Sequence, residues 1–422
     1  MGMKWTEEQS KVITLRDRNI LVSAAAGSGK TAVLVQRILS KIMDPDRPVD
    51  IDRLLIMTFT RAAAGEMKER ISNAIDQALY ENPDNEHLQR QAALIHNAQI
   101  TTIDGFCSYI IRNYFHMVEL DPGYRTAEEG ELKLLQEDVM KDLLEEAYEK
   151  ADPKFLSLVE CYASGKSDDE IRDMVYKLYQ AAMSHPYPEE WLEECMEVYR
   201  VQTIEELRET NWIQLLWETL DEKLDQAEAL TESARKICNE PDGPCFYDEA
   251  LVDDLNFWRE VRRCRETKDY DKVADILSGH TFAKLSAKRD SSIDPVKKEQ
   301  AKELRDEEKE ICKDLSTKFF NQKEEILLEL IACAREPLEG LVELTLQFKE
   351  AFSSKKREKN LLDFTDMEHF ALRILVEKVD GELIPTQAAR ELSEKYEEVM
   401  VDEYQDLSLI HISEPTRPIS IS

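Results

Sequence analysis

The stretch that decides the fold lies near the N-terminus and reads Ser23-Ala24-Ala25-Ala26-Gly27-Ser28-Gly29-Lys30-Thr31. It follows a short apolar run, Ile20-Leu21-Val22, and it precedes apolar residues at helical spacing over 33–42. This pattern predicts a strand, a glycine-containing loop and a helix, which is the setting of a phosphate-binding loop. Backbone N–H groups of such a loop converge on phosphate oxygens, and the helix N-terminus adds a partial positive charge.

The side chains at the end of this segment have the chemistry that a nucleotide requires. Lys30 can reach the β- and γ-phosphates, and the hydroxyl of Thr31 can bind Mg²⁺. The first glycine of the usual pattern G-x-x-x-x-G-K-T is Ala24 here, and a small residue still permits the tight turn. The alternative interpretation is a chance glycine turn between a strand and a helix.

Length and composition limit the classes of protein to consider. A chain of 422 residues predicts two or three domains. It has no apolar run long enough for a transmembrane helix, and its first residues lack the apolar core of a signal peptide. The eight cysteines are scattered without a C-x-x-C pair, which favours free thiols in a cytoplasmic protein over disulfides or a zinc site.

The charge balance is strongly acidic. There are 55 basic and 87 acidic residues, and the net charge is −32. Such a surface repels DNA over most of its area. A nucleic-acid site on this chain is therefore expected to be a narrow local groove.

A glutamine precedes the phosphate loop. The side-chain amide of Gln9 has both a donor and an acceptor, so it could pair with the edge of an adenine base. The alternative is an ordinary helix start that is capped by Thr6.

Two further strand–helix units follow the phosphate loop. Residues 54–60 and 99–104 predict buried strands, and helical patterns begin at Arg61 and at Gly105. Three such units in a row predict a parallel sheet with right-handed crossovers. We expect the end of the second strand to be exposed, so that Thr58, Phe59 and Thr60 offer hydroxyls and one ring, which suit phosphate contacts and base stacking on a single strand. An ordinary strand-to-helix turn is the alternative.

Strand signals stop between residues 126 and 360. Amphipathic helices are predicted instead, including one over 128–150 and one over 323–352. The change indicates a helical domain inserted into the α/β domain. We expect the charge run at 305–310 to be a solvated helix face. The basic clusters at 284–289 and 355–359 either contact phosphates or are solvated.

The α/β pattern returns at residue 361. A short apolar strand at its end is followed by Asp402 and Glu403. In a chain with a phosphate loop, Asp402 would hold Mg²⁺ and Glu403 would polarise the attacking water; an acidic turn is the alternative. The predicted organisation is therefore a motor domain at 1–125 and 361–406, a helical insert at 126–360, and a non-native or disordered tail at 407–422.

Together these motifs resemble superfamily 1 DNA helicases of the UvrD/RecB type. The matching stretches are Gln9, A-A-A-G-S-G-K-T (24–31), T-F-T-R-A-A-A-G-E-M-K-E-R-I (58–71), T-T-I-D-G-F-C (101–107) and V-D-E-Y-Q-D (401–406). Within that superfamily, R-N-Y-F-H (112–116), L-D-P (120–122) and L-D-F-T-D (362–366) are similar to the AddA-type subunits of bacterial AddAB helicase–nucleases.

The resemblance implies a RecA-like P-loop fold that binds ATP and Mg²⁺. It places nucleotide contacts at Gln9, Ala24, Ala25, Ala26, Gly27, Ser28, Gly29, Lys30, Thr31 and Gln405. The implied catalytic residues are Lys30, Asp402 and Glu403, and the metal ligands are Thr31 and Asp402. DNA contacts are implied at Thr58, Phe59, Thr60, Thr102, Asp104 and Phe106. The sequence has Asp104-Gly105 where the family usually has His-Ser.

The family also implies a cellular role. Its members translocate 3′ to 5′ on single-stranded DNA by hydrolysing ATP, and AddA pairs with AddB to process double-stranded ends for homologous recombination. AddA also carries an exonuclease domain. This chain would be a bacterial, cytoplasmic and nucleoid-associated fragment without the second motor domain or the nuclease, and hence poorly active. The alternatives are a truncated stand-alone UvrD-like helicase and a nucleotide-gated interaction module.

Overall fold

The computed structural model describes residues 4–25, 27–163, 167–288 and 290–404. The chain is mainly helical, and it forms two compact units. The first, the sheet unit, comprises Met1–Ala151, Arg172–Trp191 and Glu343–Ser422. The second, the helical unit, comprises Asp152–Ile171 and Leu192–Val342.

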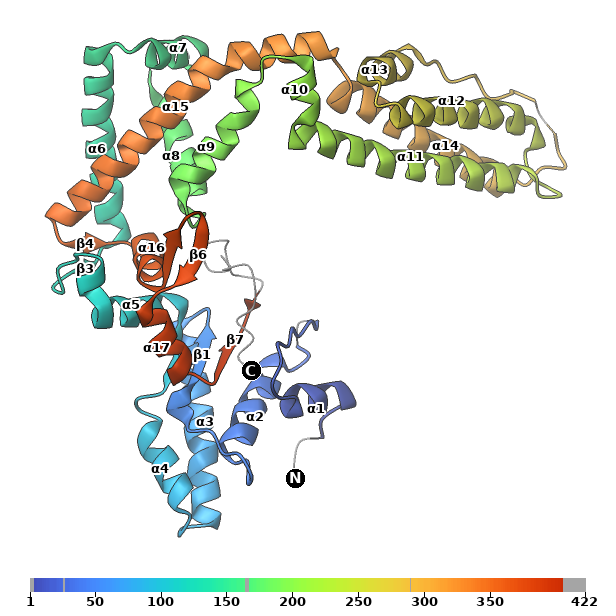
Figure 1. Ribbon diagram of the computed structural model, residues 1–422. Coiled ribbons are helices and arrows are strands. Elements are labelled where there is room, and N and C mark those ends of the chain that lie inside the picture. Colours follow the sequence, from blue (N-terminus) through green and yellow to red (C-terminus); the bar gives the residue numbers. More distant parts are fainter. Residues whose placement is uncertain (1–3, 26, 164–166, 289, 405–422) are drawn as a thin grey trace. The chain divides into compact units, whose positions relative to one another are not determined.

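A small parallel sheet forms the centre of the sheet unit. Its strands are β1 (Leu54–Thr58), β2 (Gln99–Thr102) and β7 (Glu398–Val401), in the order β2-β1-β7. In this register Ile56 lies opposite Ile100 on one side and Met400 on the other. Figure 1 shows the consequence, because β7 from the end of the chain lies beside β1 from its first part.

Helices cover both faces of this sheet. Ile56 and Met400 pack in a buried cluster with α2 (Lys30–Ile42), α3 (Arg61–Glu81) and α4 (Glu86–Leu94). Leu55 belongs to the cluster on the opposite face, with α5 (Ile103–Tyr114), α16 (Phe364–Leu375) and α17 (Gln387–Lys395). Neighbouring strand residues point to opposite faces, so a strand covered on both sides is apolar on both, as β1 is from Leu54 to Met57.

The rest of the sheet unit consists of further helices and two pairs of short strands. Its other elements are α1 (Glu7–Thr14), η1 (Ile51–Arg53), η2 (Phe115–Met117), α6 (Glu129–Lys150) and the antiparallel hairpin of β5 (Val376–Val379) and β6 (Glu382–Pro385). In addition, β3 (Arg125–Thr126) pairs in parallel with β4 (Leu361–Leu362). The long segment between β3 and β4 therefore begins and ends at neighbouring positions.

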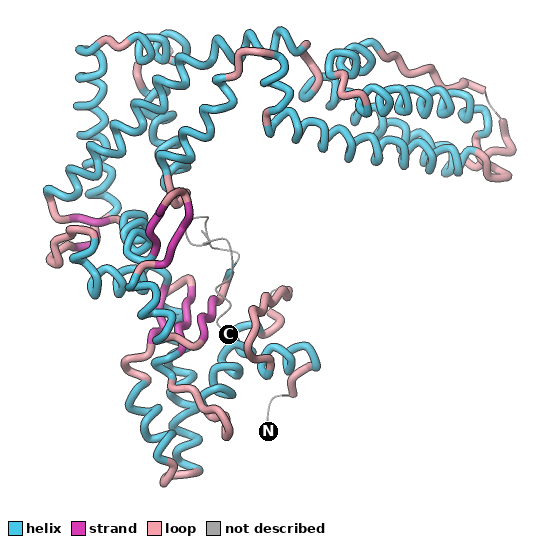
Figure 2. Tube along the Cα trace, in the orientation of Figure 1, coloured by secondary structure: helices cyan, strands magenta, loops and turns pink. Residues whose placement is uncertain are grey.

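The helical unit has helices and loops but no strand among its described residues (Figure 2). Its own helices are α7 (Pro153–Tyr162), η3 (Val198–Arg200), α10 (Ile204–Glu209), α11 (Asn211–Cys238), η4 (Cys245–Tyr247), α12 (Asp248–Glu266), α13 (Tyr270–Gly279), α14 (Pro295–Asp314) and the π-helix η5 (Leu315–Phe319). A buried cluster that includes Trp217, Trp258, Tyr270 and Phe320 forms its largest core, to which these helices other than α7 and η4 contribute. Three helices have residues in both units: α8 (Asp169–Met183), α9 (Pro188–Glu197) and α15 (Glu324–Glu358).

The prediction of a strand just before the phosphate loop was wrong. Residues 19–25 have no regular secondary structure, and Leu21 is 80% exposed. A strand is stabilised by a neighbouring strand and by burial of one face. Among the described residues β7 pairs only with β1, so the three apolar residues 20–22 have neither a partner strand nor a core to enter.

The expectation of a solvated charge run at 305–310 was wrong for two of its residues, while Asp306, Glu307 and Glu310 are exposed as expected. Arg305 and Glu308 are 1% and 0% exposed, respectively. The side chain of Arg305 donates to both carboxylate oxygens of Asp254, at 2.6 and 3.1 Å. The local sequence around Arg305 looks like a solvated helix face because it does not contain the carboxylate that pairs with Arg305. That carboxylate comes from another helix, 51 residues away.

The basic cluster at 355–359 is only partly accessible. Lys356 is buried, and its ammonium group lies 2.7 Å from carboxylate oxygens of Asp363 and Asp366. It also lies over the ring of Phe352. Within this cluster, Lys356 therefore stabilises the junction of α15 and α16 and is not exposed to a phosphate.

The helices predicted over 128–150 and 323–352 are confirmed as α6 and α15. The predicted helical domain at 126–360 stays a prediction, because α6 and the second half of α15 belong to the sheet unit. The predicted tail at 407–422 lies outside the described residues. In the part of the chain that is described, no helix is both long and apolar enough to cross a membrane.

Candidate functional site

The loop before α2 has the backbone conformation that its glycine pattern predicts. Gly27 and Gly29 have φ angles of 79° and 82°, in the left-handed region that favours glycine. Gly29 is the N-cap residue of α2, so Lys30 and Thr31 begin the helix. Ala24, Ala25 and Ser28 are exposed beside these glycines, and Ala26 lies outside the described residues.

Lys30 and Thr31 point to different partners. The ammonium group of Lys30 donates to the carbonyl oxygens of Ala24 and Ala25, at 2.9 and 3.4 Å. The hydroxyl of Thr31 lies 3.3 Å from Oδ2 of Asp402. The first contact keeps the lysine over its own loop, and the second joins the start of α2 to the end of β7.

Asp402 and Glu403 lie at the carboxyl end of β7. The backbone N–H of Asp402 donates to the carbonyl of Met57 at 2.9 Å, which extends the ladder by one residue beyond the strand. Glu403 follows with a φ of 58° and an exposed side chain. A left-handed conformation costs a non-glycine residue free energy, and it turns the chain away from the sheet at this point.

A pocket of about 370 Å³ opens between these elements. It is lined by Thr31, Thr58, Phe59, Thr60, Ala63, Glu66, Met67, Arg70, Asp402 and Glu403. A hydroxyl and a carboxylate oxygen in contact are the kind of oxygen pair that Mg²⁺ prefers. The donor set at the junction of α2 and β7 therefore fits a magnesium ion that accompanies a phosphate group.

Gln9 contacts the phosphate loop. Its Nε2 donates to the carbonyl of Ser28 at 3.2 Å, while its Oε1 accepts from the backbone N–H of Thr6 at 3.0 Å. The hydroxyl of Thr6 in turn accepts from the N–H of Gln9, which completes a capping box. The capped helix start is thus confirmed, and recognition of adenine by Gln9 stays a prediction.

The residues predicted to contact DNA at the end of β1 differ in exposure. Phe59 is 62% exposed, whereas Thr58 is 1% exposed and donates its hydroxyl to the carbonyl of Thr60. The expectation of an exposed strand end was therefore wrong for Thr58. The hydroxyl of Thr60 accepts from the backbone N–H of Ala63 at 3.1 Å and caps α3.

The second predicted DNA-contact segment lies beside the first, because Thr102 pairs with Thr58 in the sheet. Thr102 is buried and caps α5 through the N–H of Gly105, at 3.1 Å. Asp104 is half-buried in the first turn of that helix. Phe106 stacks on Tyr109, with ring centroids 6.0 Å apart, and meets the edge of Tyr396.

The structure thus brings the predicted nucleotide residues together at one end of the sheet. Lys30, Thr31, Asp402 and Glu403 lie there, and Gln9 joins them through Ser28. The predicted DNA residues lie at the same ends of β1 and β2. Gln405 lies outside the described residues.

Sequence reasoning missed one group of charges at the other end of β7. The carboxylate of Glu398 at the start of β7 contacts Arg37 and Lys41 of α2. Both basic side chains are buried. The available signal was the pair of basic residues four apart on the apolar face of α2, which requires an acidic partner from elsewhere in the chain.

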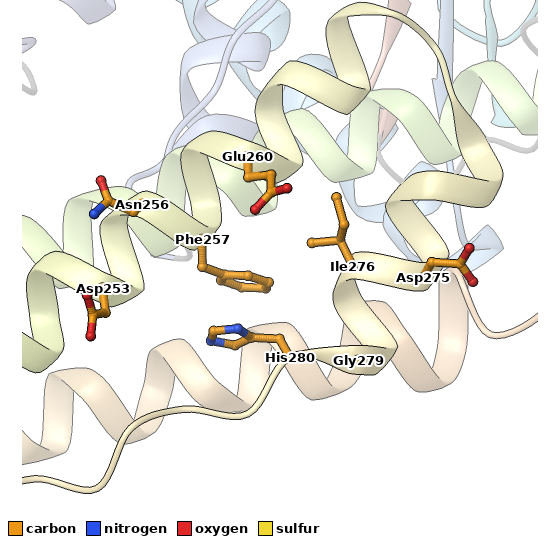
Figure 3. Close-up of a pocket in the computed structure, with 8 residues that line it drawn as sticks. All are labelled: Asp253, Asn256, Phe257, Glu260, Asp275, Ile276, Gly279 and His280. Carbon is orange, nitrogen blue, oxygen red and sulfur yellow. The ribbon is translucent and has the colours of Figure 1, made fainter.

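A second pocket, of about 400 Å³, lies in the helical unit. In Figure 3 the rings of Phe257 and His280 stack there, with centroids 3.7 Å apart. Asp253, Glu260 and Asp275 supply carboxylates around them, and burial lowers the pKa of His280. An acidic lining of this kind repels phosphate groups, so this pocket does not suit a nucleotide.

Comparison with known proteins agrees with the geometry at the end of the sheet. Residues 5–413 match the family model described as the UvrD/REP helicase N-terminal domain. The chain belongs to this family. The small parallel sheet with its phosphate loop fits the RecA-like fold that the motifs predict, and the resemblance to UvrD-type helicases is confirmed.

Similar curated proteins are named as the A-type subunit of an ATP-dependent helicase/nuclease. The chain is 48% identical over 408 residues to the one from Lachnoclostridium phytofermentans, covering 96% of this chain and 30% of that protein. It is 43% identical to the one from Clostridium perfringens, with 97% and 32% covered, and 38% identical to the one from Bacillus pumilus, with 96% and 33% covered. The chain therefore spans about a third of the length of these relatives, and the predicted likeness to AddA-type proteins is confirmed.

Proposed function

We propose that this chain is the ATP-binding motor part of a 3′–5′ DNA helicase and exonuclease subunit that repairs double-strand breaks by homologous recombination. The observation that carries the proposal is the 3.3 Å contact between Thr31 and Asp402. It supports the proposal because it joins the two halves of the proposed nucleotide site, which lie 371 residues apart in the sequence. The family and the named relatives support the same interpretation.

In this proposal the phosphate loop from Ala24 to Gly29 surrounds the phosphates, and Lys30 leaves its carbonyl partners to contact them. Thr31 and Asp402 hold Mg²⁺, which neutralises phosphate charge when it is bound. Glu403 accepts a proton from the water that attacks the phosphate. Gln9 and Gln405 contact the base side of ATP.

In this proposal single-stranded DNA binds next to the nucleotide site, at the carboxyl ends of β1 and β2. Exposed Phe59 stacks on a base, and residues at the starts of α3 and α5 contact the backbone of single-stranded DNA, among them Thr60, Thr102 and Asp104. The partners are single-stranded DNA, double-stranded ends in the full complex, and an AddB-type subunit. The protein works in the bacterial cytoplasm, associated with the nucleoid.

Hydrolysis by this chain alone is expected to be slow. In this family an arginine from the second motor domain completes the ATP site, and such an arginine contributes about 10³–10⁵ in rate. The proposed domains are the motor at 1–125 and 361–406 and the helical insert at 126–360. The pairing of β3 with β4, which joins the two ends of that insert, supports this division.

Titration of fluorescent ATP with Mg²⁺ tests the proposal. Lys30→Ala removes a charge-assisted contact of about 1.5–3 kcal/mol, so its affinity should fall roughly 10–150-fold. Lys11→Ala is the matched control, because Lys11 is an exposed lysine of the same unit that pairs with Glu7 at the surface. Equal affinities of wild type and Lys30→Ala would refute the site.

A further inference from the structure

We propose that Glu398 is a positioning residue that fixes the register of α2 against β7 and so sets the separation of Thr31 and Asp402. The inference rests on the proposed function, because Thr31 and Asp402 are its proposed magnesium ligands. Glu398 itself lies at the opposite end of β7 from Asp402 and does not line the pocket.

The carboxylate of Glu398 is shared between two buried cations of α2. Its Oε1 lies 2.6 Å from Nε of Arg37, and its Oε2 contacts the ammonium group of Lys41. Arg37 and Lys41 are 6% and 8% exposed. They are four residues apart and therefore lie on one face of the helix. Both oxygens of one side chain thus hold two successive turns of α2.

The two contacts between α2 and β7 lie at opposite ends of the strand. From Glu398 to Asp402 the strand advances roughly 13 Å at about 3.3 Å per residue. From Thr31 to Arg37 and to Lys41 the helix advances roughly 9 and 15 Å at about 1.5 Å per residue. These lengths match, so α2 and β7 contact each other at both ends. A slide of the helix at Glu398 therefore displaces Thr31 from Asp402.

Apolar packing alone does not define this register. Met400 belongs to the same buried cluster as Val35, Ile38 and Leu39, but apolar burial is non-directional and tolerates small slides of one element over another. A carboxylate that contacts a guanidinium and an ammonium group has defined distances and angles. The contact of Glu398 with Arg37 and Lys41 therefore defines the position of α2 along β7, whereas the apolar contact stabilises the pair without defining that position.

Arg37 also connects this contact to α1. Its Nη1 donates to the carbonyls of Val12 and Leu15, at 2.5 and 2.8 Å, where α1 ends and carbonyls lack helical partners. Helix α1 carries Gln9, which contacts the phosphate loop through Ser28. Arg37 and Glu398 thus hold three elements that carry proposed nucleotide residues: α1, α2 and β7.

The test compares ATP affinity with Mg²⁺ and with EDTA. Residues that orient metal ligands typically change metal affinity about 10–100-fold when they are replaced. Glu398→Gln should therefore weaken Mg·ATP binding by about tenfold or more and leave metal-free ATP binding within about twofold. Glu397→Gln is the matched control, because Glu397 is a neighbouring, more exposed glutamate that pairs with Arg53. Lys41→Met removes one of the two contacts and should give an intermediate loss.

A second measurement does not need a nucleotide. In a crystal structure of Glu398→Gln or Lys41→Met, the separation of Thr31 Oγ1 and Asp402 Oδ2 should exceed the present 3.3 Å. An unchanged separation would overturn the inference, as would equal losses of affinity with and without Mg²⁺. A wild-type chain that binds no nucleotide in either buffer would instead overturn the proposed function, and the crystal structures would still decide the role of Glu398.

Discussion

Two groups of charged residues, one at the end of the sheet and one in the helical unit, differ in burial more than in type. At the end of the sheet, Asp402 and Lys30 are half-buried and Glu403 is exposed at the rim of a pocket. In the helical unit, Asp254 and Arg305 are fully buried and satisfy each other. Charges of the first kind can exchange partners for a ligand at low cost, whereas charges of the second kind hold helices together. The same residue types therefore suit binding in the first group and hold the fold together in the second.

The largest expected effect comes from breaking the buried pair. Arg305→Ala leaves the carboxylate of Asp254 uncompensated in the core, which should lower the free energy of unfolding by about 3–5 kcal/mol. Lys30→Ala should change it by less than about 0.5 kcal/mol, since its contacts are to loop carbonyls at the surface. Urea denaturation of both variants measures the contrast.

Replacing both partners sharpens this prediction. The double variant Arg305→Met with Asp254→Leu removes both charges and should recover most of the lost stability. If Arg305→Ala were no less stable than Lys30→Ala, burial would not distinguish the two groups of charges, and the comparison would fail.

The next largest expected effect is a pH dependence of the free energy of unfolding that comes from Glu308. Burial raises the pKa of Glu308 from 4.5 to about 7, although its Oε1 accepts from the indole N–H of Trp258 at 2.6 Å. Between those two values the native state keeps a proton that the unfolded state has lost. The contribution of Glu308 to the free energy of unfolding should therefore be greatest below pH 4.5. It should fall as the pH rises toward 7, by about 3 kcal/mol at most.

Glu308→Gln keeps the acceptor for Trp258 and cannot ionise. Urea titrations at about pH 5 and about pH 7 should show a smaller loss of stability between the two values in this variant than in wild type. Glu310→Gln on the same helix is the control, because Glu310 is exposed and pairs with Lys313. An identical pH dependence in Glu308→Gln and wild type would mean that Glu308 is ionised in the native state.

These contrasts explain which features the sequence could predict. The glycine–lysine–threonine loop, the strand before Asp402 and the helices α6 and α15 follow from patterns within a few residues. Burial of Arg305 depends on Asp254 from another helix, and burial of Arg37 depends on Glu398, which is 361 residues away. The strand predicted at 20–22 failed for the same kind of reason, because a strand needs a partner that local pattern cannot supply.

A smaller effect is expected at the exposed ring of Phe59. If Phe59 stacks on a base, Phe59→Ala should weaken binding of single-stranded DNA by about 1–3 kcal/mol and leave stability nearly unchanged. Tyr80→Ala is the control, since Tyr80 is an exposed aromatic residue near the far end of α3. Fluorescence anisotropy with a labelled oligonucleotide measures both variants, and equal affinities would remove Phe59 from the DNA site.

The smallest expected effect tests whether the hydroxyl of Thr60 only caps α3 or also contacts single-stranded DNA. Its hydroxyl accepts from the N–H of Ala63, so Thr60→Ala should cost about 1 kcal/mol of stability. Thr203→Ala should cost a similar amount, because Thr203 caps α10 in the same way in the helical unit. Only Thr60→Ala should also weaken binding of single-stranded DNA, and Thr60→Ser should restore both properties. If Thr60→Ala and Thr203→Ala lost stability equally and bound DNA equally well, the hydroxyl of Thr60 would serve the fold alone.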